Sequence, residues 1–334
     1  MLRWGILSTA KIAREHIIPA HLKARGNCVT AIASRDPAKA AEVASRFQIP
    51  QVLPDYQALL ASDHIDAVYI PLPTSQHVEW AIHAANAGKH VLVEKPLALQ
   101  ADAITAVQAA AVANQVIVTE AFMVHYHPQW QLVRRWLAEG RIGRLRHVQA
   151  AFSYYNRDPN NMRNRPELGG GGIADIGVYP TITARLATGQ EPLKVRADIT
   201  FDAEFGTDSY ANIQYAFADF DMTFYLSTSM ATHQSMRFHG DAGYIQVDAP
   251  YNAELYSDVR VSLWDRNHQE VTTQRFGGVN QYQLQAEAFA DAIANGDSSS
   301  LFSLDSSLAN QRALDAIFAA HKHGGWAAVT QAAG

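Results

Sequence analysis

Short apolar runs alternate with longer segments of helical spacing over the first 120 residues. The apolar runs have the length of strands and cover residues 2–7, 29–33, 66–71, 90–94 and 116–119. Helical spacing predicts helices over residues 11–25, 37–47, 77–87 and 101–114. Strands that alternate with helices of about ten to fifteen residues are typical of βαβ units with right-handed crossovers. The pattern therefore predicts an α/β protein whose residues 1–120 form a doubly wound parallel sheet.

After residue 120 the pattern changes to closely spaced strands of period two. One further helix is predicted over residues 128–139, and strands follow over residues 146–152, 194–201, 210–217, 222–226, 244–247 and 260–264. Such alternation is typical of an antiparallel sheet with one solvated face. We expect helices over residues 176–186, 283–294 and 304–321 to cover the other face. Residues 121–334 are thus predicted to form an α+β domain with a large, mostly antiparallel, open sheet.

Composition narrows the class of protein. Of the 334 residues, 48% are hydrophobic and 18% are charged, as in a globular protein with a large core. The net charge of −5 argues against a nucleic-acid partner, and no apolar run reaches the roughly 20 residues that span a membrane. The first residues lack the layout of a signal peptide, so we expect a cytoplasmic protein. Cys28 is the single cysteine, and His125 and His127 lack further ligands spaced to complete a metal site.

The turn after the first strand matches part of a dinucleotide-binding fingerprint. That fingerprint, Gly-x-Gly-x-x-Gly/Ala, places a pyrophosphate at the amino end of the next helix. This chain has Ser8, Ala10 and Ala13 at the three positions, so the third position alone is met. An ordinary strand-to-helix turn is the alternative. The residues predicted to contact a cofactor here are Ser8, Thr9, Ala10, Lys11 and Ile12.

The tip of the second strand bears on the choice of cofactor. An acid there binds the ribose 2′-hydroxyl of NAD, whereas an arginine suits the 2′-phosphate of NADP. Ser34 and Arg35 occupy the tip, and Lys39 lies one helical turn further on. We predict that these three residues bind NADP(H) in preference to NAD(H). Asp36 would favour NAD(H) if it binds the ribose, but it could instead only cap the next helix. The alternative for Arg35 is a solvated surface charge.

Two prolines stiffen the segment that follows the strand over residues 66–71. Pro71 and Pro73 fix the backbone beside the expected adenosine–phosphate channel. The alternatives are that Thr74 or Ser75 caps the next helix and that His77 is simply a helix-start residue. The cofactor contacts predicted here are Leu72, Pro73, Thr74 and His77.

Two motifs carry the candidate chemistry. Glu94-Lys95-Pro96 puts an ammonium group at the carboxyl end of a parallel strand, where open α/β sheets bind ligands. A glycine run at residues 169–172 precedes Asp175 and Tyr179, which are four apart and so project from one helical face. Oxidation of an alcohol moves a hydride from carbon and a proton from oxygen to a base. A free phenol is a poor base at neutral pH, but a neighbouring ammonium group favours phenolate.

We therefore predict that Lys95, Tyr179 and Asp175 are the catalytic residues of a hydride-transfer enzyme whose two domains meet over the nicotinamide. Tyr179 exchanges the proton, and Asp175 orients Lys95 or accepts from a substrate hydroxyl. Taken singly, each motif has an ordinary alternative, which is a turn for the first and a helix surface for the second. Their occurrence together with a βαβ domain favours the chemical interpretation.

Polar groups and rings after the predicted strand over residues 116–119 suggest a polyol or sugar substrate, because a sugar ring stacks on an aromatic face. Core packing is the alternative for the rings of Phe122 and Tyr126. The substrate-side candidates are Glu120, Phe122, His125, Tyr126 and Tyr179.

With these motifs the chain resembles the glucose–fructose oxidoreductase / inositol dehydrogenase / MocA-type oxidoreductases over nearly its whole length. The Ser8-Thr9-Ala10 turn departs from that family, where most relatives have glycines. Thr119-Glu120-Ala121-Phe122-Met123 and Tyr179 are most similar to the dimeric dihydrodiol dehydrogenase / NADP-dependent D-xylose dehydrogenase branch. The resemblance rests on Trp4-Gly5-Ile6, Ile12-Ala13, Glu94-Lys95-Pro96, the glycine run and Asp175-Ile176-Gly177-Val178-Tyr179-Pro180.

The resemblance implies an N-terminal Rossmann domain followed by a substrate-binding and oligomerisation domain. It implies that Lys95 and Tyr179 are the catalytic pair, that Glu94, Lys95 and Pro96 line the nicotinamide, and that Arg163 faces cofactor or substrate. It also implies a homodimer formed through the open face of the second-domain sheet.

The predicted function is NADP(H)-dependent hydride transfer to or from a sugar, polyol or trans-dihydrodiol. Two alternatives stay open. One is a nicotinamide-dependent, non-redox glycosidase of the same fold, and the other is a nucleotide-sensing protein without turnover.

Overall fold

The structure, a computed structural model, describes residues 1–253 and 258–331, and its contacts divide the chain into two units. Unit 1 consists of residues 1–123 and 280–308. Unit 2 holds the described residues of 124–279 and 309–331. The chain thus returns to its first unit late in the sequence, which differs from the predicted single division into residues 1–120 and 121–334.

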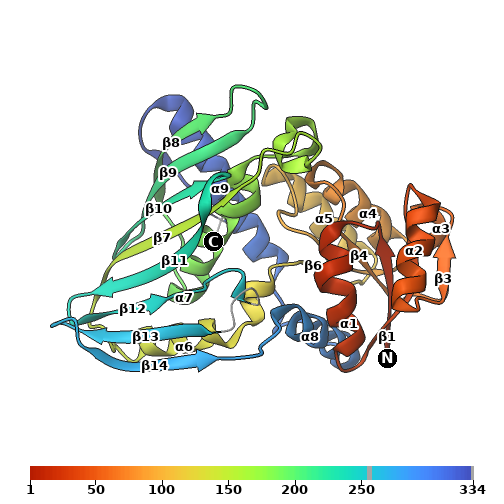
Figure 1. Cartoon of the computed structure of the whole chain (residues 1–334), viewed down its shortest axis with the longest axis horizontal. Coiled ribbons are helices and arrows are strands. Elements are labelled where there is room, and N and C mark those ends of the chain that lie inside the picture. Colours follow the sequence, from red (N-terminus) through yellow and green to blue (C-terminus); the bar gives the residue numbers. More distant parts are fainter. Residues whose placement is uncertain (254–257, 332–334) are drawn as a thin grey trace. The chain divides into compact units, whose positions relative to one another are not determined.

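Unit 1 is built on a six-stranded parallel sheet in the order β3-β2-β1-β4-β5-β6 (Figure 1). This is the strand order of a doubly wound fold, in which ligands bind beyond the carboxyl ends of the strands. The predicted parallel sheet is confirmed, although β3 is too short to show in the sequence pattern. The strands are β1 Leu2–Leu7, β2 Asn27–Ala33, β3 Gln51–Leu53, β4 Ala67–Ile70, β5 His90–Val93 and β6 Val118–Glu120.

The early helices of unit 1 lie close to their predicted positions, and α3 is an additional short one. A π-helical turn, Ala13–Ile17, runs into α1, and a 3₁₀ turn, Thr74–Gln76, precedes α4. The helices are α1 Ile18–Lys23, α2 Pro37–Phe47, α3 Tyr56–Leu60, α4 His77–Asn86 and α5 Asp102–Ala113.

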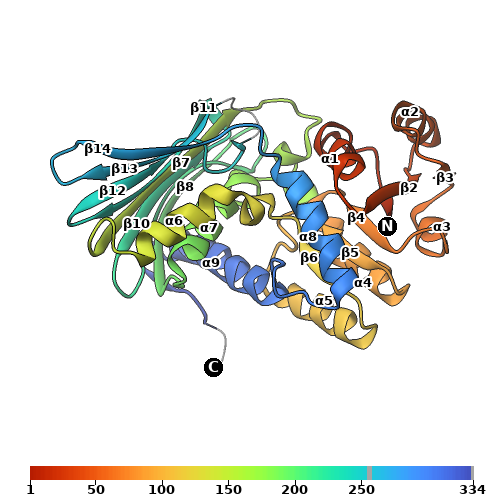
Figure 2. The ribbon, with the colours of Figure 1, turned by 90° about the horizontal axis from the view of Figure 1, so that it is seen from below.

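One helix packs elsewhere than the sequence pattern suggests. α8, Gln281–Asn295, is expected on the second sheet, but it packs against α1 and β2 in unit 1 (Figure 2). The ring of Phe289 lies on that of Trp4, with centroids 5.0 Å apart, and Asn27 donates its amide to the Ala286 carbonyl at 3.2 Å. Helical periodicity shows that α8 has an apolar face, but it does not show which sheet that face covers.

Unit 2 is built on a nine-stranded sheet in the order β14-β13-β12-β11-β7-β10-β9-β8-β15 (Figure 1). Its described neighbouring strands pair antiparallel except β7 with β10, so the predicted mostly antiparallel sheet is confirmed. β11, β14 and β15 lie outside the predicted strands. The strands are β7 Leu145–Tyr155, β8 Lys194–Phe201, β9 Asp208–Ala216, β10 Asp221–Ser227, β11 Ser229–Gly240, β12 Gly243–Val247, β13 Val259–Asp265, β14 Glu270–Phe276 and β15 Ala327–Ala328.

Helices cover one side of the unit 2 sheet. α6, Pro128–Ala138, and α7, Val178–Thr188, pack on each other, and a π-helical turn, Ile173–Gly177, leads into α7. α9, Leu304–His323, starts among the residues of unit 1 and continues into unit 2. Figure 2 shows these helices on the same side of the sheet, and within residues 1–253 and 258–331 no helix covers its other face. No helix among the described residues is long and apolar enough to cross a membrane.

Candidate active site

The turn between β1 and the first helix holds Ser8 at a φ of 115°, a backbone region that suits glycine. The N–H of Ser8 donates to the Ala33 carbonyl at 2.7 Å, and its hydroxyl accepts from the N–H of Ala10 at 3.0 Å. Arg14 also braces the turn, because its Nε donates to the Thr9 carbonyl at 2.9 Å. A serine therefore forms here the tight turn that a glycine forms in the fingerprint.

The helix after this turn presents an anion-binding end. Lys11 and Ile12 are its first residues, and the first N–H groups of a helix have no partner within it. The positive end of the helix dipole adds to their attraction for an anion. Lys11 itself is exposed and pairs with Glu15 at 3.8 Å. The backbone of this segment fits a dinucleotide pyrophosphate although the first two glycines are absent.

The acid near the tip of β2 is used by the next helix. Asp36 caps α2, and its Oδ1 accepts from the N–H groups of Ala38 and Lys39 at 3.1 and 3.2 Å. These bonds, that of Lys39 foremost, hold the pKa of Asp36 below its ordinary value. Ser34 is buried, and its hydroxyl accepts from the N–H of Asp36 at 3.2 Å. Asp36 is thus the helix cap, and the guanidinium group of Arg35 is the exposed charge directly before it.

Lys95 lies on the loop after β5, at the carboxyl edge of the unit 1 sheet. Glu94 anchors the start of this loop: its Oε1 accepts from the Tyr69 hydroxyl at 2.6 Å, and its Oε2 accepts from the N–H of Lys95 at 3.2 Å. The peptide bond between Lys95 and Pro96 is cis. The predicted position of Lys95 at a strand end is confirmed.

His77, the first residue of α4, connects two loops at this edge. Its buried ring places Nδ1 2.8 Å from the carbonyl oxygen of Pro96 and Nε2 2.7 Å from that of Leu72. Burial lowers the pKa of the His77 imidazole. Pro73 and the buried Thr74 lie between Leu72 and His77, in the predicted cofactor segment. The structure thus ties that segment to the loop of Lys95 through one side chain.

Glu120, at the end of β6, binds the same loop from another side. Its Oε1 accepts from the N–H of Leu97 at 2.8 Å. Burial raises the pKa of Glu120 to about 7, against the hydrogen bond from the N–H of Leu97. Sequence reasoning suggested a substrate contact and missed this bond, because a carboxylate that binds a backbone N–H leaves no signal in sequence spacing.

The remaining substrate-side candidates differ in their surroundings. Phe122 is fully buried in unit 1 and meets the ring of Phe302 edge-on, with centroids 5.0 Å apart, which is core packing. His125 and Tyr126 are half-buried in unit 2, and their rings meet edge-on with centroids 4.9 Å apart.

Asp175 in unit 2 is held by two side chains. Its Oδ2 accepts from Nε of Arg163 and from the hydroxyl of Tyr154, each at 2.7 Å. The Asp175 side chain is 12% exposed and that of Arg163 is 41% exposed. The charge of Asp175 raises the pKa of Arg163, and burial raises the pKa of Tyr154. The three groups form an ion pair with a phenol attached, and Tyr154 is a member that sequence reasoning missed.

The glycine run brings the start of this segment against its neighbours in unit 2. Gly171 has a φ of 130°, and a Cβ atom there would lie 2.1 Å from Oδ1 of Asp208. The other carboxylate oxygen of Asp208 accepts from the N–H of Ile173 at 2.6 Å. Burial raises the pKa of Asp208 to about 7. The glycines therefore allow a buried carboxyl group to reach the start of the π-helical turn.

Tyr179, on α7, is buried within a cluster of rings. Its centroid lies 5.8 Å from that of Phe152 and 5.7 Å from that of Tyr251, and Phe152 and Tyr251 stack at 4.8 Å. Phe152 and Tyr154 are two residues apart on β7, so their side chains leave the same face of the strand. One face of β7 therefore supports both Tyr179, through Phe152, and Asp175, through Tyr154. The spacing of two residues between Phe152 and Tyr154 is visible in the sequence.

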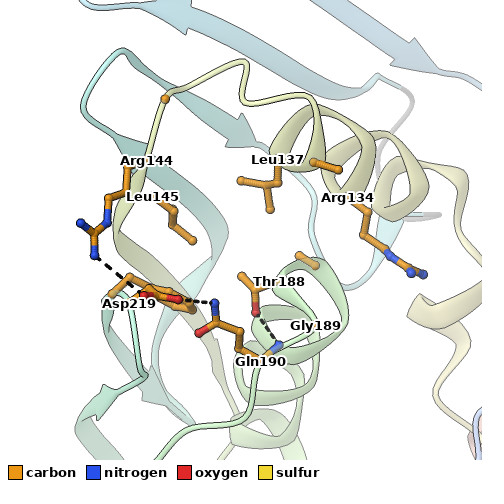
Figure 3. Close-up of a pocket in the computed structure, with 12 residues that line it drawn as sticks. Arg134, Leu137, Arg144, Leu145, Thr188, Gly189, Gln190 and Asp219 are labelled. Atoms are coloured by element: carbon orange, nitrogen blue, oxygen red, sulfur yellow. Dashed lines mark hydrogen bonds and ion pairs between the residues drawn. The ribbon is translucent and has the colours of Figure 1, made fainter.

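A separate hollow of about 580 Å³ lies in unit 2, near the ends of α6 and α7 (Figure 3). Oδ2 of Asp219 accepts a hydrogen bond from the side-chain amide of Gln190 at 3.0 Å, and its Oδ1 lies 3.8 Å from the guanidinium group of Arg144. None of the predicted site residues lines this hollow.

The comparisons with known proteins agree with these features. Residues 2–122 match the family described as oxidoreductase family, NAD-binding Rossmann fold, and residues 130–246 match the GFO/IDH/MocA C-terminal domain. An uncharacterized oxidoreductase of Rhizobium meliloti is 37% identical over 98% of this chain and 99% of its own length. The chain belongs to the GFO/IDH/MocA oxidoreductase family. It is therefore an NAD(P)-dependent oxidoreductase, and the predicted family and enzyme class are confirmed.

Other members of the family point to sugar chemistry. The D-xylose 1-dehydrogenase (NADP(+)) 2 of Haloferax volcanii is 33% identical over 95% of this chain and 96% of its own length. A 3-ketoreductase from Actinomadura kijaniata, solved in complex with NADP and TDP-benzene, is 28% identical, has a TM-score of 0.89 and covers 96% of this chain and 97% of its own. Variants of that ketoreductase with a lysine replaced by alanine and a tyrosine replaced by phenylalanine also match. The two replaced positions have the same separation along that chain as Lys95 and Tyr179 have here.

Proposed function

We propose that this oxidoreductase uses NADP(H) to transfer a hydride between the nicotinamide and a hydroxyl or carbonyl carbon of a sugar or polyol. The observation that carries the proposal is the anchored loop of Lys95 at the carboxyl edge of a doubly wound sheet. A cation fixed at that edge is suited to bind and polarise a substrate oxygen. Two relatives that span nearly the whole chain act on a sugar or a ketone.

The proposed roles divide between the two units. When bound, NADP⁺ accepts the hydride from the substrate carbon and NADPH supplies it in the reverse direction. Lys95 binds the substrate oxygen and favours its negative charge. Tyr179 takes the proton from that oxygen during oxidation and returns it during reduction. Asp175 keeps the start of α7 in place through Arg163 and Tyr154, the contacts that support this role.

The cofactor preference rests on the tip of β2. The carboxylate of Asp36 is occupied by the first N–H groups of α2, whereas Arg35 is exposed. An arginine there binds a 2′-phosphate, so we propose NADP(H) as the main cofactor and NAD(H) as a poorer one. Arg35→Ala is expected to raise the KM for NADP⁺ about tenfold and to leave that for NAD⁺ unchanged. Equal effects on both would contradict the assignment.

A homodimer through the helix-free face of the unit 2 sheet is also part of the proposal. Large apolar side chains are exposed on strands of this sheet, namely Tyr155, Met230 and Val271. Exposed apolar groups on one sheet favour burial against a second copy. Light scattering on the purified protein measures the molar mass in solution and tests this directly.

A spectrophotometric screen tests the function. Aldoses, ketoses, polyols and trans-dihydrodiols are offered with NADP⁺ or NAD⁺, and absorbance of the reduced nicotinamide is followed. We expect net reduction of NADP⁺ with at least one sugar or polyol. Binding of NADPH without turnover of any compound would favour a nucleotide sensor. Cleavage of a glycosidic bond without net NADPH formation would favour the non-redox glycosidase.

A further inference from the structure

One peptide group beside Lys95 is bound at both of its ends by buried side chains. The carbonyl of Pro96 and the N–H of Leu97 belong to the same planar peptide unit. Nδ1 of His77 lies 2.8 Å from that carbonyl oxygen, and Oε1 of Glu120 accepts from that N–H at 2.8 Å. His77 is 1% exposed and Glu120 is 3% exposed, so bulk water does not compete for either bond.

The two bonds reach the loop from either side of β5, because His77 begins α4, the helix that follows β4, and Glu120 ends β6. The backbone bonds between β4 and β5 extend to Glu94, whose N–H donates to the Ile70 carbonyl at 3.0 Å. Beyond that point His77 lies between the two loops, with Nε2 2.7 Å from the Leu72 carbonyl oxygen and Nδ1 at the Pro96 carbonyl. A neutral ring donates to one of these carbonyls and an imidazolium ring to both. Glu120 ends β6, the other neighbour of β5. The loop is therefore tied to both neighbouring strands.

The bound peptide is joined to Lys95 by a stiff stretch of chain. The ring of Pro96 fixes its own φ, and the peptide groups on both sides of it are planar. An orientation imposed on the peptide between Pro96 and Leu97 is thus passed to Lys95 with few free torsions in between. A displacement of about 1 Å at a reacting group lowers a rate about 100-fold. Loss of the two bonds that hold this peptide is therefore expected to lower kcat.

We propose that His77 and Glu120 are positioning residues of this enzyme, which aim Lys95 by holding the Pro96–Leu97 peptide at its two ends. The inference rests on the proposed function, in which Lys95 binds the substrate oxygen. It assigns both side chains to the backbone of the loop rather than to the cofactor or the substrate.

Hydrogen exchange of the Leu97 amide tests the anchoring without cofactor or substrate. In the full-length protein, His77→Phe and Glu120→Leu are each expected to raise its exchange rate about tenfold or more. Glu120→Gln keeps an acceptor oxygen and is expected to stay near the wild-type rate. The matched control is His83→Phe, at an exposed position of the same helix. Exchange that is unchanged in both His77→Phe and Glu120→Leu overturns the proposal.

Kinetics separates the aiming of Lys95 from cofactor binding. His77→Phe is expected to lower kcat about 100-fold, while the Kd for NADPH, measured by fluorescence, changes less than about threefold. A Kd that rises as much as kcat falls would make His77 a cofactor ligand and would refute the inference. If circular dichroism shows that His77→Phe does not fold, His77→Asn takes its place. The same large decrease in kcat with little change in the Kd for NADPH is expected. A wild-type protein that turns over no sugar counts against the proposed function, whereas the exchange experiment still decides on the anchoring.

Discussion

The candidate residues of unit 1 and those of unit 2 are held in different ways. In unit 1, Lys95 is positioned through main-chain bonds before and after it, made by Glu94, His77 and Glu120. In unit 2, Tyr179 is positioned by contacts with its own ring, and Asp175 by bonds to its own carboxylate. Main-chain bonds fix where a side chain starts, whereas ring contacts fix where its functional atom lies. Substitutions around Lys95 should therefore tolerate any side chain that keeps the same bond, and substitutions around Tyr179 should depend on shape.

The largest effect on turnover is expected at Tyr179, because its hydroxyl is the proposed acid–base group. Tyr179→Phe preserves the contacts with Phe152 and Tyr251 and removes the atom proposed to exchange the proton. We expect kcat to fall roughly 10²–10⁴-fold, with the Kd for NADPH and the melting temperature nearly unchanged. Steady-state kinetics and thermal unfolding measure the three quantities. An unchanged kcat would show that unit 2 does not supply the acid–base group.

A second prediction uses one buried carboxyl group from each unit. The pKa of Glu120 is raised from 4.5, and that of Asp208 from 3.8, each to about 7 by burial. Folding then favours the protonated forms of both carboxyl groups. Their contribution to the free energy of unfolding is complete below the pKa values of the unfolded chain, 4.5 and 3.8, and is lost as the pH rises through 7. The shifts correspond to about 3 kcal/mol for Glu120 and about 4 kcal/mol for Asp208 at most.

Glu120→Gln removes the ionisation in unit 1 and keeps an acceptor for Leu97. The free energy of unfolding of the wild-type protein is expected to decrease between pH 5 and pH 8. In Glu120→Gln this decrease is expected to be about half as large. Asp208→Asn is the matched change in unit 2. Denaturant titrations at the two pH values provide the comparison. Parallel pH profiles for wild type and both variants would rule out these carboxyl groups as the source.

A third prediction concerns the shared oxygen of Asp175. Tyr154→Phe and Arg163→Ala each remove one donor to Oδ2, and each is expected to lower the free energy of unfolding by about 1 kcal/mol. The arginine is partly exposed, which limits its share. Because both donors serve one oxygen, the double variant should lose less than the sum, and a double-mutant cycle measures the difference. Strict additivity would mean that the two bonds are independent.

The smallest effect is expected at the turn of Ser8 in unit 1. Ser8→Ala removes the hydroxyl that accepts from Ala10 and keeps a Cβ atom at a φ of 115°. Ser8→Gly removes the same bond but relieves the backbone strain. Ser8→Gly should therefore be about 1 kcal/mol more stable than Ser8→Ala, measured by chemical unfolding. A glycine variant less stable than the alanine variant would contradict the strain at this position.

Much of the fold follows from local signals in the sequence. Asp36 before Pro37 predicts the start of α2, and the structure shows Asp36 bonded to its first N–H groups. The alternation of strands and helices predicts the parallel sheet because each element shows its own period. β3, α3 and β15 are too short for a period to appear, and β11 and β14 expose many of their side chains.

The proposed catalytic residues leave a signal in the sequence, whereas the groups that hold them do not. Lys95 follows a strand end and Tyr179 follows a glycine run, and both patterns are visible in the chain. The bonds of His77 and Glu120 go to backbone atoms, which every residue carries, so no sequence pattern identifies them. The place of α8 depends on the match between Phe289 and Trp4, which are far apart in sequence.

The return of the chain to unit 1 has a practical consequence for protein engineering. A fragment that ends near residue 122, where the Rossmann match ends, would lack α8 and leave Trp4 without the ring that covers it. Such a truncation is expected to aggregate rather than to yield a minimal nucleotide-binding module. Exchange of substrate specificity between relatives is therefore best made by grafting an insert between residues 123 and 280, with both flanking segments retained from one parent.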